Sequence, residues 1–241
     1  MSPASAHCRN WKNSIGMKQV IVQSTTGVTL AGGGRFSLEL LRFAQKFAPR
    51  LVAADGGANR LLALGAEPEA VIGDFDSISN KARDALGPAR LFPIPEQATT
   101  DFDKALRSIS APFVLGVGFA GARQDHNLAV LNTLVRYPDH RCLVLGGADV
   151  TFLAPQDMSL TLPIGSRLSL FPMGPVSGDS AGLRWPIQGL RFAPDGMIGT
   201  SNQVTGPVHL RFDAARMLVI LPRAAVAAAL HGLGLTGVHG Q

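Results

Sequence analysis

The chain has 241 residues, of which 46% are hydrophobic and 16% are charged, and its formal net charge is +5. A chain of this length and apolar content can bury the core of one large domain or of two small ones. The low charge density without a Lys/Arg-rich run argues against a nucleic-acid partner, and no apolar run approaches the roughly 18 residues of a membrane span. Cys8 and Cys142 are too few for a disulfide scaffold or a cysteine-rich metal site, which indicates a reducing compartment such as the cytoplasm.

The first residues differ from the rest of the chain. Residues 1–16 are basic, the first acidic residue is Glu39, and no hydrophobic segment of a signal peptide follows. We predict that residues 1–16 form a disordered extension ahead of a second methionine, Met17. A targeting role is the alternative.

Short apolar runs alternate with helical patterns between Val28 and about Gly147. Runs such as VTLAGG, RLVAAD, AVIGD, PFVLGVG and RCLVLGG read as strands, and residues 36–47, 58–64, 102–109 and 127–135 read as helices. Regular alternation of this kind predicts a parallel sheet covered by helices on both faces, the doubly wound α/β arrangement. We assign this domain to residues 17–148.

After Ala148 the helical patterns stop and short apolar runs follow one another. Short runs such as RLSLFPM, GLRWPI, MIGTSN and VHLRF are punctuated by Gly and Pro, which predicts a smaller antiparallel β domain over residues 149–241. The Ala-rich stretch RAAVAAALHGLGL near the end predicts a short terminal helix.

The stretch AVIGDFDSISN, residues 70–80, runs from a predicted strand into Asp74 and Asp76, which flank Phe75. If strand geometry continues, the two aspartates share one face, with Cα atoms about 6.6 Å apart. Such a pair repels unless a cation lies between the two acids or one of them is protonated. Mg²⁺, which is commonly held by one or two carboxylates together with substrate phosphates, suits this pair. A solvated turn or a helix N-cap is the alternative.

Ligands of open α/β sheets bind beyond the carboxyl ends of the strands. Four predicted loops, AADGGANR, GDFDS, QATTDFDKA and GFAGARQDHN, bring to that edge acids for a metal, basic groups for phosphate, and glycines where the backbone must approach closely. The candidate residues are Asp55, Asp74, Asp76, Gln97, Thr100, Asp101, Lys104, Arg123 and Asp125.

Local structural roles are the alternatives for several of these residues. Thr100 is also a suitable helix N-cap with Asp103 three residues later, which would leave Asp101 as a favourable charge at the helix start. Asp125 is likewise suited to cap a helix that begins at His126 or Asn127. His126 has no second histidine at ligand spacing, which argues against a histidine metal site.

Two short motifs point elsewhere. GVGFAG, residues 116–121, has the spacing of a dinucleotide fingerprint, but the helical pattern begins only after Asp125, too late for that motif. The DFD pair also resembles the D-x-D metal site of nucleotide-sugar glycosyltransferases, which would make the protein a glycosyltransferase.

The ordered series DGGANRLLALGAEPEAVIGDFDSIS, QATTDFDKAL and GFAGARQDHNLAVLNTL, followed by a β-rich tail with GLRW and GTSN, resembles the thiamine pyrophosphokinase family over about Val28 to Pro222. The resemblance implies an α/β nucleotide-binding domain, a β-sandwich domain and a homodimer. It also implies transfer of a diphosphate group from ATP to the hydroxyl of thiamine, with release of AMP.

The resemblance assigns roles to the candidate residues. Asp74, Asp76 and Asp101 would ligate Mg²⁺, and Asp55 and Asn59 would line the same cleft. The phosphates would be surrounded by Gln97, Thr100, Lys104, Arg123 and Asp125.

The β-rich tail would hold thiamine. Trp185 would stack on its rings and Ser201 and Asn202 would bond to its pyrimidine, across the dimer interface; a core position is the alternative for Trp185. The chain departs from the family pattern at Ala122, where many members have a second glycine, and in the Gly/Pro-rich segment after SLFPM.

Attack of an alcohol on a phosphorus atom is catalysed mainly by alignment and by neutralisation of phosphoryl charge, which acids holding a metal, Arg and Lys can provide. A nearby carboxylate, Asp55 or Asp125, is a candidate to accept the proton of the alcohol. A sensor of thiamine or nucleotide that has lost catalysis is a further alternative.

Overall fold

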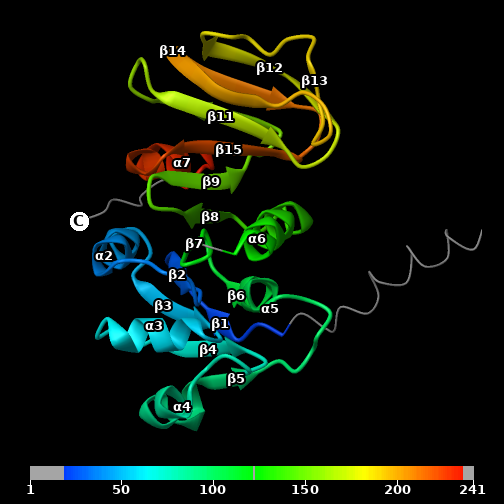
Figure 1. Ribbon diagram of the computed structural model, residues 1–241. Helices are drawn as coiled ribbons and strands as arrows, with labels where there is room; N and C mark the ends of the chain where they lie inside the picture. Colours follow the sequence, from blue (N-terminus) through cyan, green and yellow to red (C-terminus); the bar gives the residue numbers. More distant parts are fainter. Residues whose placement is uncertain (1–18, 122, 236–241) are drawn as a thin grey trace, which may run out of the picture.

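The computed structural model of the chain describes residues 19–121 and 123–235. The predicted extension over residues 1–16 and the departure at Ala122 lie outside these ranges. Figure 1 shows an elongated molecule in which one half consists of strands flanked by helices and the other half is built mainly of strands.

Six strands of the first half form the parallel part of a large sheet. Four of them are buried along their whole length, which explains why they appear in the sequence as continuous apolar runs. In spatial order the six are β5 (Leu91–Pro93), β4 (Ala70–Gly73), β3 (Arg50–Ala54), β2 (Val28–Ala31), β7 (Val114–Val117) and β8 (Cys142–Leu145).

Helices cover both faces of this parallel part. Apolar residues of α2 (Leu38–Gln45), α3 (Gly57–Ala63) and α4 (Asn80–Leu86) belong to one hydrophobic core cluster. Those of α5 (Asp101–Arg107) and α6 (Gln124–Arg136) belong to a second cluster, formed with the alternate residues of the strands. The predicted mixed α/β class is confirmed, and the loops after the parallel strands all open at one edge of the sheet.

The sheet continues without a break into the second half, because β8 pairs antiparallel with β9 (Asp149–Leu153). The neighbours that follow, all antiparallel, are β15 (Met217–Pro222), β11 (Arg167–Pro172), β14 (Gly199–Phe212), β12 (Val176–Leu183) and β13 (Arg191–Phe192). The 14-residue strand β14 pairs with β11 near its start and with β12 and β10 (Asp157–Leu160) further along. The short helix α7 (Val226–Gly232), preceded by the 3-10 turn η3 (Arg223–Ala225), packs beside β10.

Several elements differ from the sequence-based predictions. Helix α4 and the turn η2 (Pro88–Arg90) were not predicted, nor was the small parallel sheet of β1 (Val22–Gln23) and β6 (Ile109–Ser110). MIGTSN and VHLRF, read as separate runs, both fall largely in β14, since the strand passes through Gly206 and Pro207. The predicted terminal helix is confirmed in a shorter form.

Candidate active site

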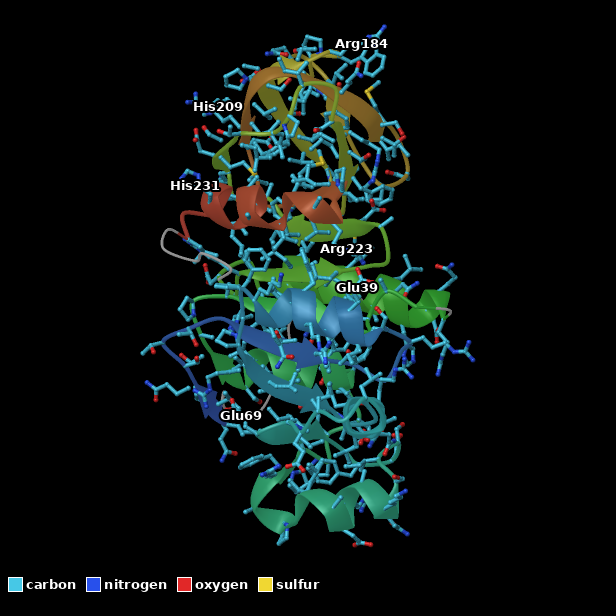
Figure 2. The ribbon with its side chains drawn as sticks, turned by 90° about the vertical axis from the view of Figure 1, so that its left-hand side faces the viewer. Glu39, Glu69, Arg184, His209, Arg223 and His231 are labelled. Carbon is cyan, nitrogen blue, oxygen red and sulfur yellow. The ribbon has the colours of Figure 1, made fainter. Side chains whose placement is uncertain are left out.

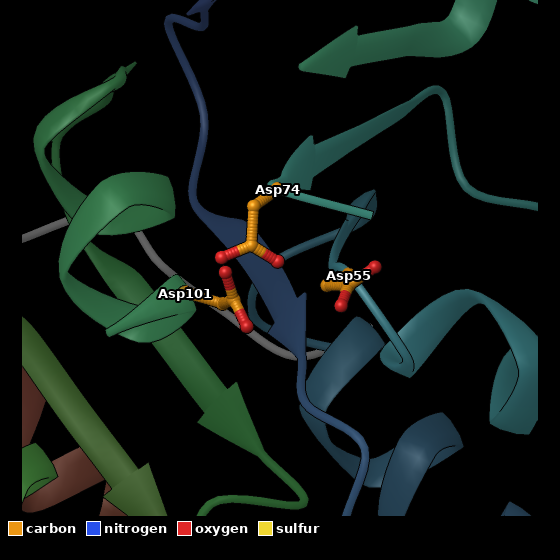
Figure 3. Close-up of side chains that lie close together, drawn as sticks. All are labelled: Asp55, Asp74 and Asp101. Carbon is orange, nitrogen blue, oxygen red and sulfur yellow. The ribbon is translucent and has the colours of Figure 1, made fainter. Parts of the chain in front are cut away.

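Three aspartates from different elements come together at the carboxyl edge of the parallel strands. Asp55 follows β3, Asp74 follows β4, and Asp101 is the first residue of α5. Each offers a carboxylate oxygen within 4.8 Å of the others, and Figure 3 shows the three side chains converging. This acid cluster (Asp55, Asp74 and Asp101) has the donor set of a hard cation.

Asp55 is the most enclosed member of the acid cluster, with 1% of its surface exposed. Its carboxylate accepts hydrogen bonds from the backbone N–H groups of Ser77 (2.9 Å) and Ile78 (3.2 Å), and its φ of 37° lies in the left-handed region. Burial raises the pKa of Asp55 to about 6, with a smaller contribution from the neighbouring charge of Asp101. The tight turn needs Gly57, where a Cβ atom would lie 2.1 Å from the carbonyl oxygen of Ala31.

Lys104 of α5 lies against the other two acids. Its Nζ atom donates to Asp74 Oδ2 (2.7 Å) and to Asp101 Oδ1 (3.2 Å), and its side chain is 1% exposed. The hydrogen bond from Lys104 holds the pKa of Asp74 below its usual value. Burial acts to lower the pKa of Lys104, but the two carboxylates outweigh it and the pKa is raised. Lys104 therefore contributes a positive charge to the acid cluster itself.

Asp76 lies beside this cluster and not in it. The strand β4 ends at Gly73, and Phe75 has a φ of 66°, so the chain turns where extended geometry was predicted. The backbone N–H of Asp76 donates to Asp74 Oδ1 (3.3 Å), and Asp76 Oδ1 accepts from Ser77 Oγ (2.7 Å). The expectation that Asp74 and Asp76 share one strand face is wrong, because the residue between them adopts a left-handed turn conformation.

Asn59 holds the loop that carries these residues. Its side-chain amide donates to the Ser77 carbonyl (2.9 Å), and its Oδ1 accepts from the N–H and the hydroxyl of Ser79. Ser79 in turn caps α4. The observed role of Asn59 is to join α3 to the turn after β4.

Gln97 and Thr100 lie in the loop between β5 and α5. The Gln97 amide donates to Asp74 Oδ2 (3.3 Å), and Thr100 caps α5 by accepting from the N–H of Asp103 (3.3 Å). Glu96 in the same loop accepts from Thr99 (2.8 Å) and from Arg107 (2.6 Å). The capping role considered for Thr100 is therefore confirmed, and the loop is tied to α5 on both sides of Gln97.

Arg123 and Asp125 form an exposed ion pair at 2.6 Å, with 69% and 63% of their side-chain surfaces exposed. Helix α6 begins at Gln124, so Asp125 lies in its first turn and is not its N-cap. In the described part of the chain, the side-chain hydrogen bonds of Arg123 go to Asp125. The pair therefore lies at the surface of the described structure.

The residues assigned to thiamine lie in the antiparallel half. Trp185 is 54% exposed, which excludes the core alternative in this chain, and the Arg184 guanidinium lies 4.9 Å from the centre of its ring. Asn202 is buried, and its side-chain amide accepts a hydrogen bond from the backbone N–H of Trp185 (3.1 Å) and donates one to the Trp185 carbonyl (2.7 Å). Ser201, with a φ of 59°, donates its backbone N–H to Ser169 Oγ.

These residues are remote from the acid cluster within one chain. Figure 1 places β12 and β14 at the opposite end of the molecule from β3, β4 and α5. Figure 2 likewise shows Arg184, next to Trp185, at the far end from Glu69, which precedes β4. One chain alone therefore does not bring Trp185 to the three acids.

Two family models match successive parts of the chain. The model described as the catalytic domain of thiamin pyrophosphokinase matches residues 43–145, and the model described as the vitamin B1 binding domain of that enzyme matches residues 157–217. Thiamine pyrophosphokinase 1 of Oryza sativa subsp. japonica is 31% identical, over 66% of this chain and 76% of that protein. Thiamine pyrophosphokinase 1 of Arabidopsis thaliana is also 31% identical, over 71% of this chain and 80% of that protein.

The chain belongs to the thiamine pyrophosphokinase family. Solved structures agree in fold: yeast thiamin pyrophosphokinase aligns with a TM-score of 0.69 at 16% identity, covering 86% of this chain and 90% of that one. A protein from Lactobacillus plantarum aligns with a TM-score of 0.68 at 27% identity, covering 83% of this chain and 99% of that one.

The segment matched as catalytic contains the acid cluster together with Lys104, Arg123 and Asp125. The segment matched as vitamin B1 binding contains Trp185, Ser201 and Asn202. The sequence predicts Asp55 at this edge because it follows a strand, whereas the resemblance to the family implies Asp76 as the third metal ligand. The structure brings Asp55, and not Asp76, to the other two acids. Among the described residues no helix is long and apolar enough to cross a membrane.

Proposed function

We propose that the protein transfers a diphosphate group from ATP to the hydroxyl group of thiamine, giving thiamine diphosphate and AMP. The observation that carries the proposal is the three-acid cluster with Lys104 at the carboxyl edge of the sheet, inside a segment that matches the family's catalytic domain. The two alternatives, a D-x-D glycosyltransferase and a silent sensor, are not favoured, because the matches cover both parts of the chain.

The acid cluster fits a divalent cation, since carboxylate oxygens from three elements converge within 4.8 Å. We assign the cation to Mg²⁺, held by Asp74 and Asp101 with either Asp55 or Asp76 as the third acid. When bound, Mg²⁺ supplies positive charge against the phosphate oxygens of ATP.

The chain's own residues position the reactants. Gln97, Thr100 and Lys104 lie around Asp74 and Asp101, so they are suited to contact the polyphosphate. Arg123 offers a planar fork for phosphate oxygens from an exposed loop. Asp125, its partner in the free protein, would orient that fork.

Asp55 is favoured over Asp125 as the acceptor of the thiamine hydroxyl proton. With Asp76, and not Asp55, as the third ligand of Mg²⁺, the pKa of about 6 that burial gives Asp55 lies near the working range of a general base. The pKa of Asp125 is lowered by its bond to Arg123, which makes it a weaker base.

The thiamine site requires a second chain in this proposal. Residues 17–148 would form the catalytic domain and residues 149–241 a β-sandwich domain, in a cytoplasmic homodimer. Trp185, exposed and held by Asn202, would stack on thiamine next to the partner's acid cluster, and Ser201 and Asn202 would contact its pyrimidine.

The experiment that tests the proposal incubates the protein with ATP, Mg²⁺ and thiamine and separates the nucleotides and the thiamine esters. The expected products are AMP and thiamine diphosphate in equal amounts, neither of which forms when thiamine is omitted. ADP as the sole nucleotide product would overturn diphosphate transfer.

A further inference from the structure

The ammonium group of Lys104 occupies the place where a cation is needed. Lys104 is among the largest fully buried side chains of the described residues, although lysine is rarely buried without a partner. Two of its three N–H donors go to Asp74 Oδ2 and Asp101 Oδ1, the two acids that the proposed metal would share. The lysine is therefore placed to offset charge repulsion within the acid cluster.

The charges of the acid cluster and of Lys104 indicate how a bound divalent cation would affect the lysine. Three carboxylates within 4.8 Å repel one another, and a buried ammonium group lowers that repulsion. A divalent cation held by the same oxygens would meet the positive charge of Lys104 within a few ångströms, in a site partly removed from water. Two cations on the oxygens of Asp74 and Asp101 oppose each other, so binding of one weakens the hold of the other.

We propose that Lys104 is the internal counter-ion of the acid cluster, and that a divalent metal binds in competition with its ammonium group. This inference rests on the proposed metal role of Asp74 and Asp101. Displacement from the two carboxylates leaves the N–H donors of Lys104 available for phosphate oxygens, which couples metal loading to nucleotide binding. If Lys104 acted only by binding phosphate, replacing it would not change the affinity for the metal in the absence of nucleotide.

The test measures Mn²⁺ affinity in the absence of nucleotide, by electron paramagnetic resonance of free Mn²⁺ and by calorimetry. Lys104→Met removes the charge and keeps much of the apolar stem, and Lys104→Arg keeps the charge. We expect Lys104→Met to bind Mn²⁺ about tenfold or more tightly than the unmodified protein, and Lys104→Arg to show no such gain. Unchanged or weaker Mn²⁺ binding by Lys104→Met would overturn the inference.

Thermal stability gives a second readout. Without metal, Lys104→Met should melt at a lower temperature than the unmodified protein, and saturating Mn²⁺ should raise its Tm by more. Lys81→Met, at an exposed lysine of α4, is the matched control and should change neither quantity. A variant that folds only with Mn²⁺ is the strongest form of the expected result, whereas equal Mn²⁺ stabilisation of Lys104→Met and the unmodified protein would contradict it.

If Lys104→Met does not fold with or without metal, amine labelling of the unmodified protein tests whether metal displaces the Lys104 ammonium group. Mass spectrometry would follow the acylation of Lys104 relative to that of exposed Lys81, with and without Mg²⁺. Greater labelling of Lys104 on addition of Mg²⁺ supports displacement, and unchanged labelling overturns it. A protein that shows the Mn²⁺ effects but forms no AMP from ATP and thiamine would reject the proposed function and leave the counter-ion role standing.

Discussion

The three acids of the cluster reach one point by different local devices. Asp55 sits at a strained turn held by two backbone N–H groups, Asp74 is held by Lys104, and Asp101 begins a helix that Thr100 caps. Lys104 also contacts Asp101, so Asp74 and Asp101 share one counter-ion, whereas the contacts that hold Asp55 do not involve it. Replacing Asp74 by its amide keeps the shape of the side chain, so we expect that change to weaken the site and to leave the fold intact.

We predict that Asp74→Asn lowers kcat for AMP formation by about 100-fold or more, equivalent to about 2.7 kcal/mol, because the amide removes a charge from the metal site. The assay is steady-state turnover at saturating Mg²⁺. Asp84→Asn, at an exposed acid of α4, is the control and should retain full activity. Near-normal turnover of Asp74→Asn would show that Asp74 does not ligate the metal.

At the scale of elements, the β5–α5 loop is secured by ionic contacts. Glu96 joins Arg107 of α5 at 2.6 Å, and Asp103 of the same helix accepts from Arg136 (2.7 Å) and Tyr137 (3.0 Å) at the end of α6. Burial acts to raise the pKa of Glu96, but the bonds from Thr99 and Arg107 outweigh it, and the pKa lies below its usual 4.5. Because the folded protein favours ionised Glu96, this carboxylate contributes stability above about pH 4.5, and the contribution is lost as the pH falls through the lowered pKa.

We expect Glu96→Gln to lower Tm by about 2 to 4 °C at pH 7, and the difference from the unmodified protein to shrink as the pH is lowered from about 5 to 3. Thermal unfolding across that pH range measures both. Glu67→Gln, which breaks the more exposed Arg90 pair, should change Tm by less. A Tm difference for Glu96→Gln that stays constant with pH would contradict the electrostatic origin.

The elements that could be predicted are those whose burial leaves a pattern in the sequence. Continuous apolar runs identified the parallel strands, because those strands are buried on both faces. The helix α4, NKARDAL, buries only Ala82 and Leu86, so it has almost no apolar stripe to detect. The turn at Phe75 depends on a single left-handed residue that is not glycine, and nothing in the spacing of the DFD pair predicts it.

At the scale of the whole molecule, the site residues are divided between the two ends of an elongated chain. Sequence order alone could assign Trp185 to the β-rich half, but the separation of that half from the acids is visible only in three dimensions. The exposed indole of Trp185 is fixed by the buried Asn202, and in the proposed function it contacts thiamine next to an acid cluster that must come from a second chain. The proposed homodimer supplies that second chain.

Trp185→Leu should raise the KM for thiamine about 5- to 30-fold with much less effect on the KM for ATP, because an indole face attracts the thiazolium cation and stacks on its ring. Initial rates at varied thiamine and varied ATP give both constants. A fall in Tm of several degrees with an unchanged KM for thiamine would make Trp185 a structural residue.

Mixing two impaired proteins tests the shared site. A 1:1 mixture of Asp74→Asn and Trp185→Leu, allowed to exchange subunits and assayed at low thiamine, should recover up to about one quarter of normal activity, since half the dimers would be mixed and each would carry one intact site. The two proteins kept apart are the control. If the dimers exchange and no activity returns, the acids and Trp185 do not meet across two chains.

The transfer of both terminal phosphates in one piece is the central claim, and ATP labelled at its β-phosphorus tests it most directly. The reaction is run with Mg²⁺ and thiamine, and the label is located after the products are separated. The proposed function predicts that the label leaves the nucleotide and appears in thiamine diphosphate, with unlabelled AMP as the other product. Label retained in ADP, with thiamine monophosphate as the ester, would contradict it.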